Sequence, residues 1–263
     1  MSSPTALITG ASSGIGREFA RQLAVRGYRL VLVARSEVKL EETAAELSDM
    51  SFSQAEILAA DLGTKTGRAA VLSRLRQGDI DLLVNNAGIG YAMPASRNVV
   101  EDEMYLLEVN GLAKVELSLT ALQVMLKRDR GAIINVSSIA GMAPAWLDSS
   151  YGPSKSLVLS HTEAMAYSRA VRASNVKMMA LCPGDVRTEF NASAGIRDAT
   201  SFGWIAPDFL VRTALADLRK GKVVSVPRRW YAFLACLIRL MPNRASKLYG
   251  YDLGKERERG TAA

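Results

Sequence analysis

Residues 5–16 read TALITGASSGIG and are the clearest indication of the fold. Its first five residues form a short apolar run that predicts a strand, and an amphipathic helical pattern over residues 17–26 follows the glycines. A glycine-rich turn between a strand and a helix lets the backbone approach a pyrophosphate, which the N–H groups and dipole of the helix N-terminus can bind. The spacing is Gly-x-x-x-Gly-x-Gly rather than the Gly-x-Gly-x-x-Gly of ordinary dinucleotide sites. We therefore predict that residues 10–16 form a nucleotide-phosphate turn.

Short apolar runs alternate with helical patterns along the rest of the chain. Further strands are expected at residues 29–34, 55–60, 80–84, 131–137, 177–181 and 222–226. Further helices are expected at residues 38–50, 64–77, 99–128, 149–173 and 207–220. Such alternation is typical of a parallel sheet that is covered by helices on both faces, with right-handed crossovers. The predicted fold class is therefore α/β, a single-domain, Rossmann-type doubly wound parallel sheet.

The end of the second predicted strand bears on the choice of nucleotide. NAD-binding proteins tend to place an acidic residue near this point to bind the ribose 2′-hydroxyl, whereas an arginine suits a 2′-phosphate. Here the strand ends in Ala34 and Arg35, and the first carboxylate is that of Glu37. We therefore favour NADP(H) as the cofactor, with a solvated surface arginine as the alternative interpretation of Arg35.

Tyr151 and Lys155 are the central catalytic candidates. They lie four residues apart at the start of a predicted helix, so both side chains point the same way. The reference pKa of a phenol is about 10, and a nearby cation lowers it. A phenol tuned in this way can act as a general acid or base near neutral pH. The pair alone does not distinguish this role from a chance spacing in a structural helix.

Two more polar residues lie where ligands are expected. Ser138 directly follows the strand predicted at residues 131–137, and ligands of open parallel sheets bind at the carboxyl ends of strands. Ser138 and the glycine turn should then share one edge of the sheet. Asn110 and Gly111 interrupt the helical pattern of residues 99–128, which predicts a local kink because both residues are poor helix formers.

Taken together, these motifs resemble the classical short-chain dehydrogenase/reductase family. The resemblance runs from about residue 5 to residue 226. The matching residues are Thr9-Gly10-x-x-x-Gly14-x-Gly16, Asp61, Asn85-Asn86-Ala87-Gly88, Asn110, Ser138, Tyr151-x-x-x-Lys155 and Pro183-Gly184. Ser138 precedes Tyr151 by 13 residues, the usual interval in that family. No catalytic position departs from the family pattern.

The resemblance implies a catalytic role for four side chains. Tyr151 would exchange a proton with the substrate oxygen, Lys155 would lower the Tyr151 pKa and hold the nicotinamide ribose, and Ser138 would position the substrate carbonyl. Asn110 would hold a water molecule that connects Lys155 to a proton relay. The hydride would come from the nicotinamide, while the protein supplies position and electrostatics.

The cofactor contacts follow partly from the residues discussed above and partly from the resemblance. Asp61 would contact the adenine ring, and Asn86 would steady the central strand and the adenosine side. The backbone of Val186 and the hydroxyl of Thr188 would contact the nicotinamide carboxamide. The full set of expected cofactor-binding residues is Gly10, Ser12, Ser13, Gly14, Ile15, Gly16, Arg35, Asp61, Leu62, Asn86, Ala87, Gly88, Tyr151, Lys155, Pro183, Gly184, Val186 and Thr188.

The last third of the chain bears on the substrate. The resemblance places a substrate lid at residues 189–206, where aromatic and small residues indicate an apolar, roomy pocket. Residues 1–227 would form the catalytic domain, and residues 228–263 a basic amphipathic extension. The extension carries an apolar helical stripe formed by Trp230, Phe233, Leu234, Leu237, Ile238 and Met241. This stripe would pack on its own domain or over the pocket, on a second subunit, or on an anionic membrane surface.

Composition and charge narrow the classes of function. Cys182 and Cys236 are far apart and His161 is the one histidine, so we predict no disulfide framework, no metal site and no histidine-based triad. Of the net charge of +7, the chain from Arg212 onward carries +8 and the remainder −1, and this nearly neutral remainder argues against nucleic-acid binding. No apolar segment reaches the length that spans a bilayer, and the N-terminus lacks the pattern of a signal peptide. We expect a cytoplasmic protein, with peripheral membrane contact through residues 228–248 as a further hypothesis.

We therefore expect an NADP-dependent oxidoreductase that interconverts a ketone or aldehyde and an alcohol. The lid and the extension favour an apolar carbonyl substrate, such as a 3-oxoacyl group, a steroid or another lipid-like ketone. The alternative is a non-catalytic dinucleotide-binding sensor or scaffold. The family resemblance also implies a homodimer or a homotetramer.

Overall fold

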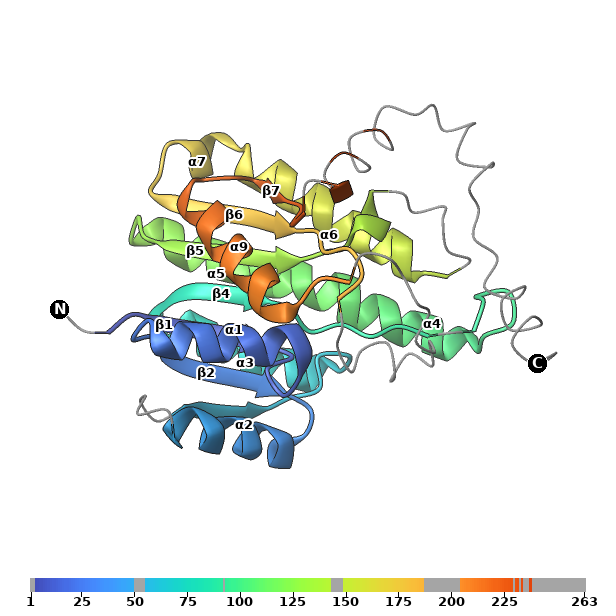
Figure 1. Cartoon of the computed structure of the whole chain (residues 1–263), viewed down its shortest axis with the longest axis horizontal. Coiled ribbons are helices and arrows are strands. Elements are labelled where there is room, and N and C mark those ends of the chain that lie inside the picture. The colour runs from blue at the N-terminus through green and yellow to red at the C-terminus, as the bar shows by residue number, and fades with distance from the viewer. Residues whose placement is uncertain are drawn as a thin grey trace.

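A seven-stranded parallel sheet forms the centre of the protein (Figure 1). The computed structural model describes residues 3–49, 55–91, 93–142, 149–186 and 204–228, together with Trp230, Tyr231, Phe233 and Leu237. The strands are β1 (Thr5–Thr9), β2 (Arg29–Ala34), β3 (Glu56–Ala59), β4 (Ile80–Asn85), β5 (Gly131–Val136), β6 (Val176–Leu181) and β7 (Val224–Ser225). Their order in the sheet is β3-β2-β1-β4-β5-β6-β7, and every neighbouring pair is parallel. The order reverses direction between β1 and β4, which confirms the predicted doubly wound α/β fold.

Helices cover both faces of this sheet. One face carries α1 (Gly14–Val25), α2 (Glu37–Asp49) and α9 (Pro207–Arg219), and Figure 1 shows α1 and α9 in front of the strands. The opposite face carries α3 (Lys65–Arg76), α5 (Ala113–Lys127) and α6 (Tyr151–Ala166). The shorter helices are α4 (Val100–Leu107) and α7 (Arg169–Arg172). Because the inner strands are covered on both sides, they consist of nearly continuous apolar runs, as the sequence predicts.

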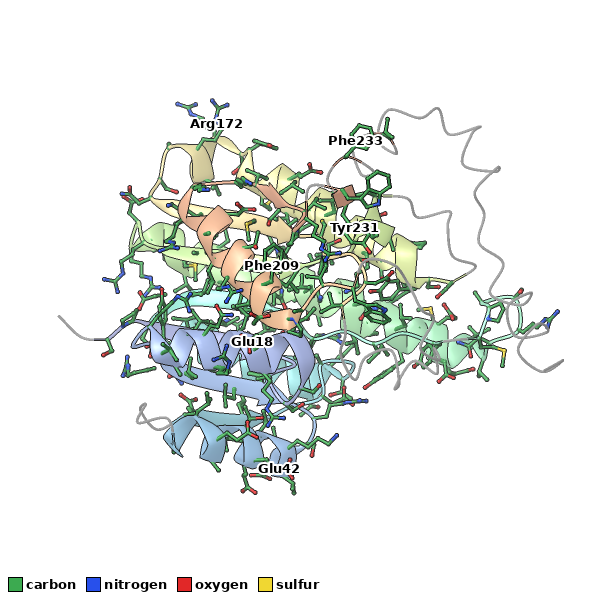
Figure 2. The ribbon with its side chains drawn as sticks, in the orientation of Figure 1. Glu18, Glu42, Arg172, Phe209, Tyr231 and Phe233 are labelled. Atoms are coloured by element: carbon green, nitrogen blue, oxygen red, sulfur yellow. The ribbon has the colours of Figure 1, made fainter. Side chains whose placement is uncertain are left out.

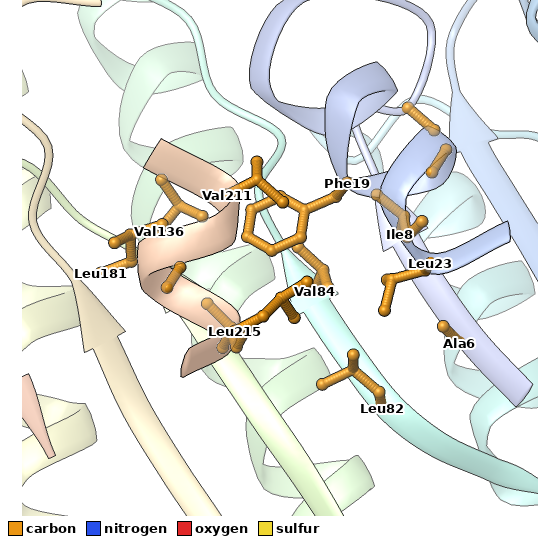
Figure 3. Packing of buried hydrophobic residues seen from close by; sticks show 14 of the residues in the cluster. Ala6, Ile8, Phe19, Leu23, Leu82, Val84, Val136, Leu181, Val211 and Leu215 are labelled. Atoms are coloured by element: carbon orange, nitrogen blue, oxygen red, sulfur yellow. The ribbon is translucent and has the colours of Figure 1, made fainter. Parts of the chain in front are cut away.

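Phe19 of α1 packs at the centre of the front layer of the core. It is fully buried and points toward Val211 of α9, close to Ile8 of β1 and Leu23 of α1 (Figure 3). Truncating such a buried phenylalanine typically costs about 3–5 kcal/mol of stability. This packing fixes α1 against the sheet, and the N-terminus of α1 is where the glycine turn must present its backbone.

The long helix predicted over residues 149–173 is wrong in its extent. α6 ends at Ala166, and Ser168 begins the separate helix α7. The hydroxyl of Ser168 accepts a hydrogen bond from the backbone N–H of Val171 at 3.4 Å, which is the contact of a helix N-cap. A serine that caps a new helix competes with the helical hydrogen bonds of the preceding one. The helical periodicity of the sequence continues across this break, so the sequence pattern did not indicate it.

The predicted kink at Asn110 is confirmed. Between α4 and α5 the chain forms a π-helical segment, Glu108–Leu112, and Asn110 is fully buried in it. Single-turn π-segments insert an extra residue into a helix and are frequent at functional sites.

Several expectations fall outside the described residues. They concern Thr188, most of the lid at residues 189–206, and the stripe residues Leu234, Ile238 and Met241. Within the described ranges, no helix is long and apolar enough to cross a membrane. The side chain of Cys182 is fully buried in the core.

Candidate active site

The glycine turn has the conformation that phosphate binding requires. Gly10 and Gly14 adopt positive φ angles of 66° and 52°, which residues with a side chain rarely adopt. A Cβ on Gly16 would clash with the carbonyl oxygen of Gly10, so the turn and the helix can pack this closely only with glycine at position 16. Ser13 is the N-cap of α1, but its side chain makes no capping hydrogen bond. The N–H groups of the first helical turn are therefore available to an anionic ligand.

Asn86 ties the glycine turn to the end of β4. Its side-chain Nδ2 donates to the carbonyls of Thr9 and Gly10 at 3.0 and 3.3 Å. In return, Oγ1 of Thr9 accepts hydrogen bonds from the backbone N–H groups of Asn86 and Ala87, each at 2.9 Å. These contacts join two strand ends that lie 77 positions apart in the sequence.

A cavity of about 670 Å³ runs along the carboxyl ends of the strands. The predicted site residues that line it are Gly10, Ser12, Ser13, Gly14, Ile15, Arg35, Asp61, Leu62, Asn86, Ala87, Gly88, Ser138, Tyr151, Lys155, Pro183, Gly184 and Val186. Gly16 and Asn110 are buried just outside its lining. The structure thus brings together in one cleft the motifs from both halves of the chain.

Three catalytic candidates meet at the inner end of this cavity. Ser138 follows β5 and caps a short 3₁₀ helix, accepting the backbone N–H of Ala140 at 3.1 Å. Its hydroxyl also forms a hydrogen bond with the phenol of Tyr151. Lys155, one helical turn after Tyr151 in α6, places its Nζ 5.2 Å from the centre of the tyrosine ring. A phenol, a hydroxyl and an amine therefore converge on the same space.

The expected lowering of the Tyr151 pKa is wrong for this structure. Desolvation of the phenol, together with the Asp185 carboxylate, raises the pKa of Tyr151 to about 12, although the hydrogen bond with Ser138 opposes this. Burial likewise lowers the pKa of Lys155 to about 8. Tyr151 is therefore protonated at neutral pH, the state of a proton donor.

Asn110 holds the loop that follows β4. Its Oδ1 accepts the backbone N–H of Ile89 and its Nδ2 donates to the Ile89 carbonyl, both at 2.8 Å. Lys155 is close by, because a Cβ on Gly88 would lie 3.0 Å from Oδ1 of Asn110 and 3.4 Å from Nζ of Lys155. The side chain of Asn110 thus positions backbone beside Lys155, and its role in a water-mediated proton relay stays a prediction.

The outer end of the cavity holds residues that the sequence motifs did not reveal. The phenol of Tyr105, from α4, donates to the Asp61 carboxylate at 2.8 Å and accepts from Nη1 of Arg35 at 3.3 Å. Ser36 and Lys39 also line this end. Lys39 lies in the first turn of α2, four residues after Arg35, so its nearness in sequence could have found it. Tyr105 is 44 positions from Asp61, and no local pattern connects the two.

The short chain dehydrogenase family matches residues 4–198 of the chain. The protein therefore belongs to the short-chain dehydrogenase/reductase family, a family of oxidoreductases.

Individual relatives are about a third identical to this chain over the aligned residues. A very-long-chain 3-oxoacyl-CoA reductase of Anas platyrhynchos is 35% identical over 161 residues, which are 58% of this chain and 51% of the reductase. The chain thus spans about half the length of that relative.

Two solved structures match nearly the whole chain. A short-chain dehydrogenase from Sphingobium yanoikuyae in complex with NADPH is 35% identical, with a TM-score of 0.81 over 91% of this chain and 97% of that one. A bulky-bulky ketone specific alcohol dehydrogenase from Comamonas testosteroni is 27% identical, with a TM-score of 0.77 over 91% of this chain and 95% of that one.

Proposed function

We propose that the protein is an NADP-dependent oxidoreductase that interconverts an apolar ketone or aldehyde and the corresponding alcohol. The observation that carries this proposal is the convergence of Tyr151, Ser138 and Lys155 on the cavity that also contains the glycine turn. Membership of the family supports the reaction class. The similarity to a 3-oxoacyl-CoA reductase and to a bulky-ketone alcohol dehydrogenase supports a large apolar carbonyl as the substrate.

The cavity fits a nicotinamide dinucleotide phosphate. The glycine turn and the uncapped start of α1 would hold the pyrophosphate. A Cβ at Gly10 would lie 2.9 Å from the side chain of Asn86, so the turn has room only for glycine at this position. Arg35 and Lys39 are exposed cations at the outer end, where they would hold a 2′-phosphate. When bound, the nicotinamide supplies or accepts the hydride. The NADPH complex of the Sphingobium relative supports this cofactor.

The side chains at the inner end would carry the proton chemistry. Ser138 would donate a hydrogen bond to the substrate carbonyl, and the Tyr151 phenol would pass its proton to the oxygen as the carbonyl is reduced. The Lys155 ammonium would hold the ribose hydroxyls beside them. Because the pKa of Tyr151 is about 12, a phenolate that could act as a base is scarce at neutral pH. At pH 7 the protonated Tyr151 phenol is in the state that carbonyl reduction uses.

NADPH oxidation, followed across a panel of carbonyls with NADH in parallel, tests this function. The panel runs from small ketones to 3-oxoacyl esters and steroid ketones, and Tyr151→Phe is the matched control. We expect turnover with bulky apolar ketones, faster with NADPH, and loss of that turnover in the variant. Tight NADPH binding without turnover of any carbonyl would instead favour the dinucleotide sensor or scaffold.

We also propose that the C-terminal extension contacts an anionic membrane surface. Tyr231 is buried against Gly184, which lines the cofactor cavity. A Cβ added to Gly184 would clash with the Tyr231 ring. In contrast, Trp230, Phe233 and Leu237 are 68%, 56% and 44% exposed, and Figure 2 shows Phe233 at the edge of the described chain. These three side chains of the stripe thus leave much of their surface open to solvent. An exposed Trp-bearing apolar face in a basic segment suits anionic lipid.

Co-sedimentation with vesicles tests the membrane proposal. Phosphatidylcholine vesicles with and without a quarter of phosphatidylserine would be compared for the full chain and for a Trp230→Glu/Phe233→Glu variant. We expect binding that depends on phosphatidylserine and is lost in the variant. If the full chain ignores the vesicles and the variant instead changes the sedimentation-equilibrium mass, the exposed face is a subunit contact.

A further inference from the structure

Lys114 is a buried lysine for which the proposed reaction has no use. It lies in the first turn of α5, directly after the π-helical segment, and is only 1% exposed. Its Nζ donates to the carbonyl of Val136 at 2.7 Å and to the carbonyl of Asn86 at 3.4 Å. Nζ of Lys155 reaches the same Val136 carbonyl at 3.4 Å. Two lysine amines thus meet beneath the inner end of the cavity, within hydrogen-bonding reach of each other.

The surroundings of this lysine pair contain little negative charge. Among the described residues, no carboxylate forms an ion pair with Lys114 or Lys155. Glu108 and Glu116, from the same helical stretch as Lys114, pair with Arg68 instead. From the other elements, the titratable groups nearby are Tyr151 beside Lys155, the Cys182 thiol, and the exposed Asp185, which acts on Tyr151. Two desolvated amines without a carboxylate between them cannot both keep a proton.

The hydrogen bonds indicate which amine is neutral. A neutral amine has two N–H donors and one lone pair, whereas an ammonium has three donors and no acceptor. The two carbonyls of Val136 and Asn86 use both donors of a neutral Lys114, and its lone pair is left for an N–H of Lys155. Lys155 lines the cavity and Lys114 does not, so the charged amine is the one that can face a ligand.

We propose that Lys114 is a positioning residue for Lys155: its neutral amine accepts a hydrogen bond from the Lys155 ammonium and keeps the single positive charge on the lysine that faces the cofactor. This inference rests on the proposed function, because it assigns a task to Lys155 in cofactor binding.

The pKa directions of the two lysines agree with this assignment. Burial, reinforced by the neighbouring Lys155, holds the pKa of Lys114 well below its usual value. Burial also lowers the pKa of Lys155 to about 8, but the hydrogen bond to Lys114 raises it and so limits the shift. Removing the Lys114 amine therefore makes Lys155 lose its proton at lower pH.

The experiment measures NADPH affinity and kcat/KM for carbonyl reduction between pH 5.5 and 9.5 in the full chain. Lys114→Met keeps most of the side-chain volume without an acceptor, and Lys114→Gln keeps an acceptor oxygen on a shorter stem. We expect Lys114→Met to move the midpoint of both pH profiles about one pH unit toward acid, and Lys114→Gln to move it less in the same direction. Ser118→Ala, on the same helix as Lys114, is the control, because it removes a buried hydrogen bond that Asn135 of β5 donates to Ser118. It should leave both midpoints unchanged.

Two results would overturn the role of Lys114. Coincident profiles for wild type and Lys114→Met would reduce it to a structural residue, and a shift toward alkaline pH would mean that Lys114 itself carries charge and repels Lys155. If Lys114→Met does not fold, as judged by circular dichroism, the direction of the Lys114→Gln shift decides. If wild type turns over no carbonyl, the proposed function fails, and the pH profile of NADPH affinity still tests Lys114.

Discussion

The two ends of the cofactor cavity both carry positive side chains but hold them in opposite surroundings. At the outer end, Arg35 and Lys39 are exposed to water. At the inner end, Lys155 is 4% exposed and Lys114 is 1% exposed. An exposed cation attracts phosphate through solvent, so salt weakens this attraction. Burial instead lowers the pKa of an amine, so that its charge changes at a pH closer to neutrality. The two ends therefore differ in how their positive charge responds: salt acts on the outer end, and pH acts on the inner end.

The largest effect should come from removing the Tyr151 phenol at the inner end. We expect Tyr151→Phe to lower kcat for carbonyl reduction by about 10²–10⁴-fold, because it removes a general acid. NADPH affinity, measured by fluorescence, should change little. Tyr105→Phe is the matched control at the outer end and should keep turnover within a few fold. Equal losses of kcat in the two variants would contradict the assignment of the proton chemistry to the inner end.

The next largest effect concerns the exposed cations. We expect Arg35→Ser to reduce the preference for NADPH over NADH by about 10–100-fold in kcat/KM, because charge-assisted hydrogen bonds to a 2′-phosphate are lost. The rate with NADH should stay close to that of wild type. Arg212→Ser, which alters an exposed arginine paired with Asp208 on α9, serves as the control. An unchanged preference in Arg35→Ser would leave Arg35 as a solvated surface residue.

The pH dependence of the wild-type reaction tests the protonation states of Lys155 and Tyr151 at the inner end. Lys155 is charged below its pKa of about 8 and neutral above it, whereas Tyr151, with a pKa of about 12, stays protonated throughout. We therefore expect kcat/KM for reduction to fall above pH 8, by up to about tenfold per unit, with no tyrosine limb near neutrality. A limb that rises with pH between 7 and 9 would contradict this protonation scheme.

The smallest effect should be that of salt. Raising ionic strength from about 0.05 to 0.5 M should weaken NADPH binding by a few fold, since the outer cations are screened. NADH binding, which does not use a 2′-phosphate, should respond less. The same weakening for both cofactors would show that Arg35 and Lys39 do not act on that phosphate. Isothermal titration calorimetry at the two salt concentrations provides the measurement.

Local patterns predicted most of the fold and the inner catalytic group. The strand, glycine turn and helix of residues 5–25 follow from apolar runs and backbone freedom, and Tyr151 and Lys155 share a helix face because they are one turn apart. Asn110 was found because it interrupts a helical pattern. The break at Ser168 was missed, since apolar periodicity continued through it and only the capping contact marks it.

The order of the elements, the glycine turn and the spacing of Tyr151 and Lys155 could be read from the chain alone, because each depends on residues within a few positions of one another. Only the tertiary structure brought Tyr105 to Asp61 and Lys114 to Lys155, since those contacts require α4 and α5 to close over the ends of other strands. It also decided the protonation of the inner end. A pKa depends on the water and charges that packing removes or brings near, and neither can be inferred from residue spacing along the chain.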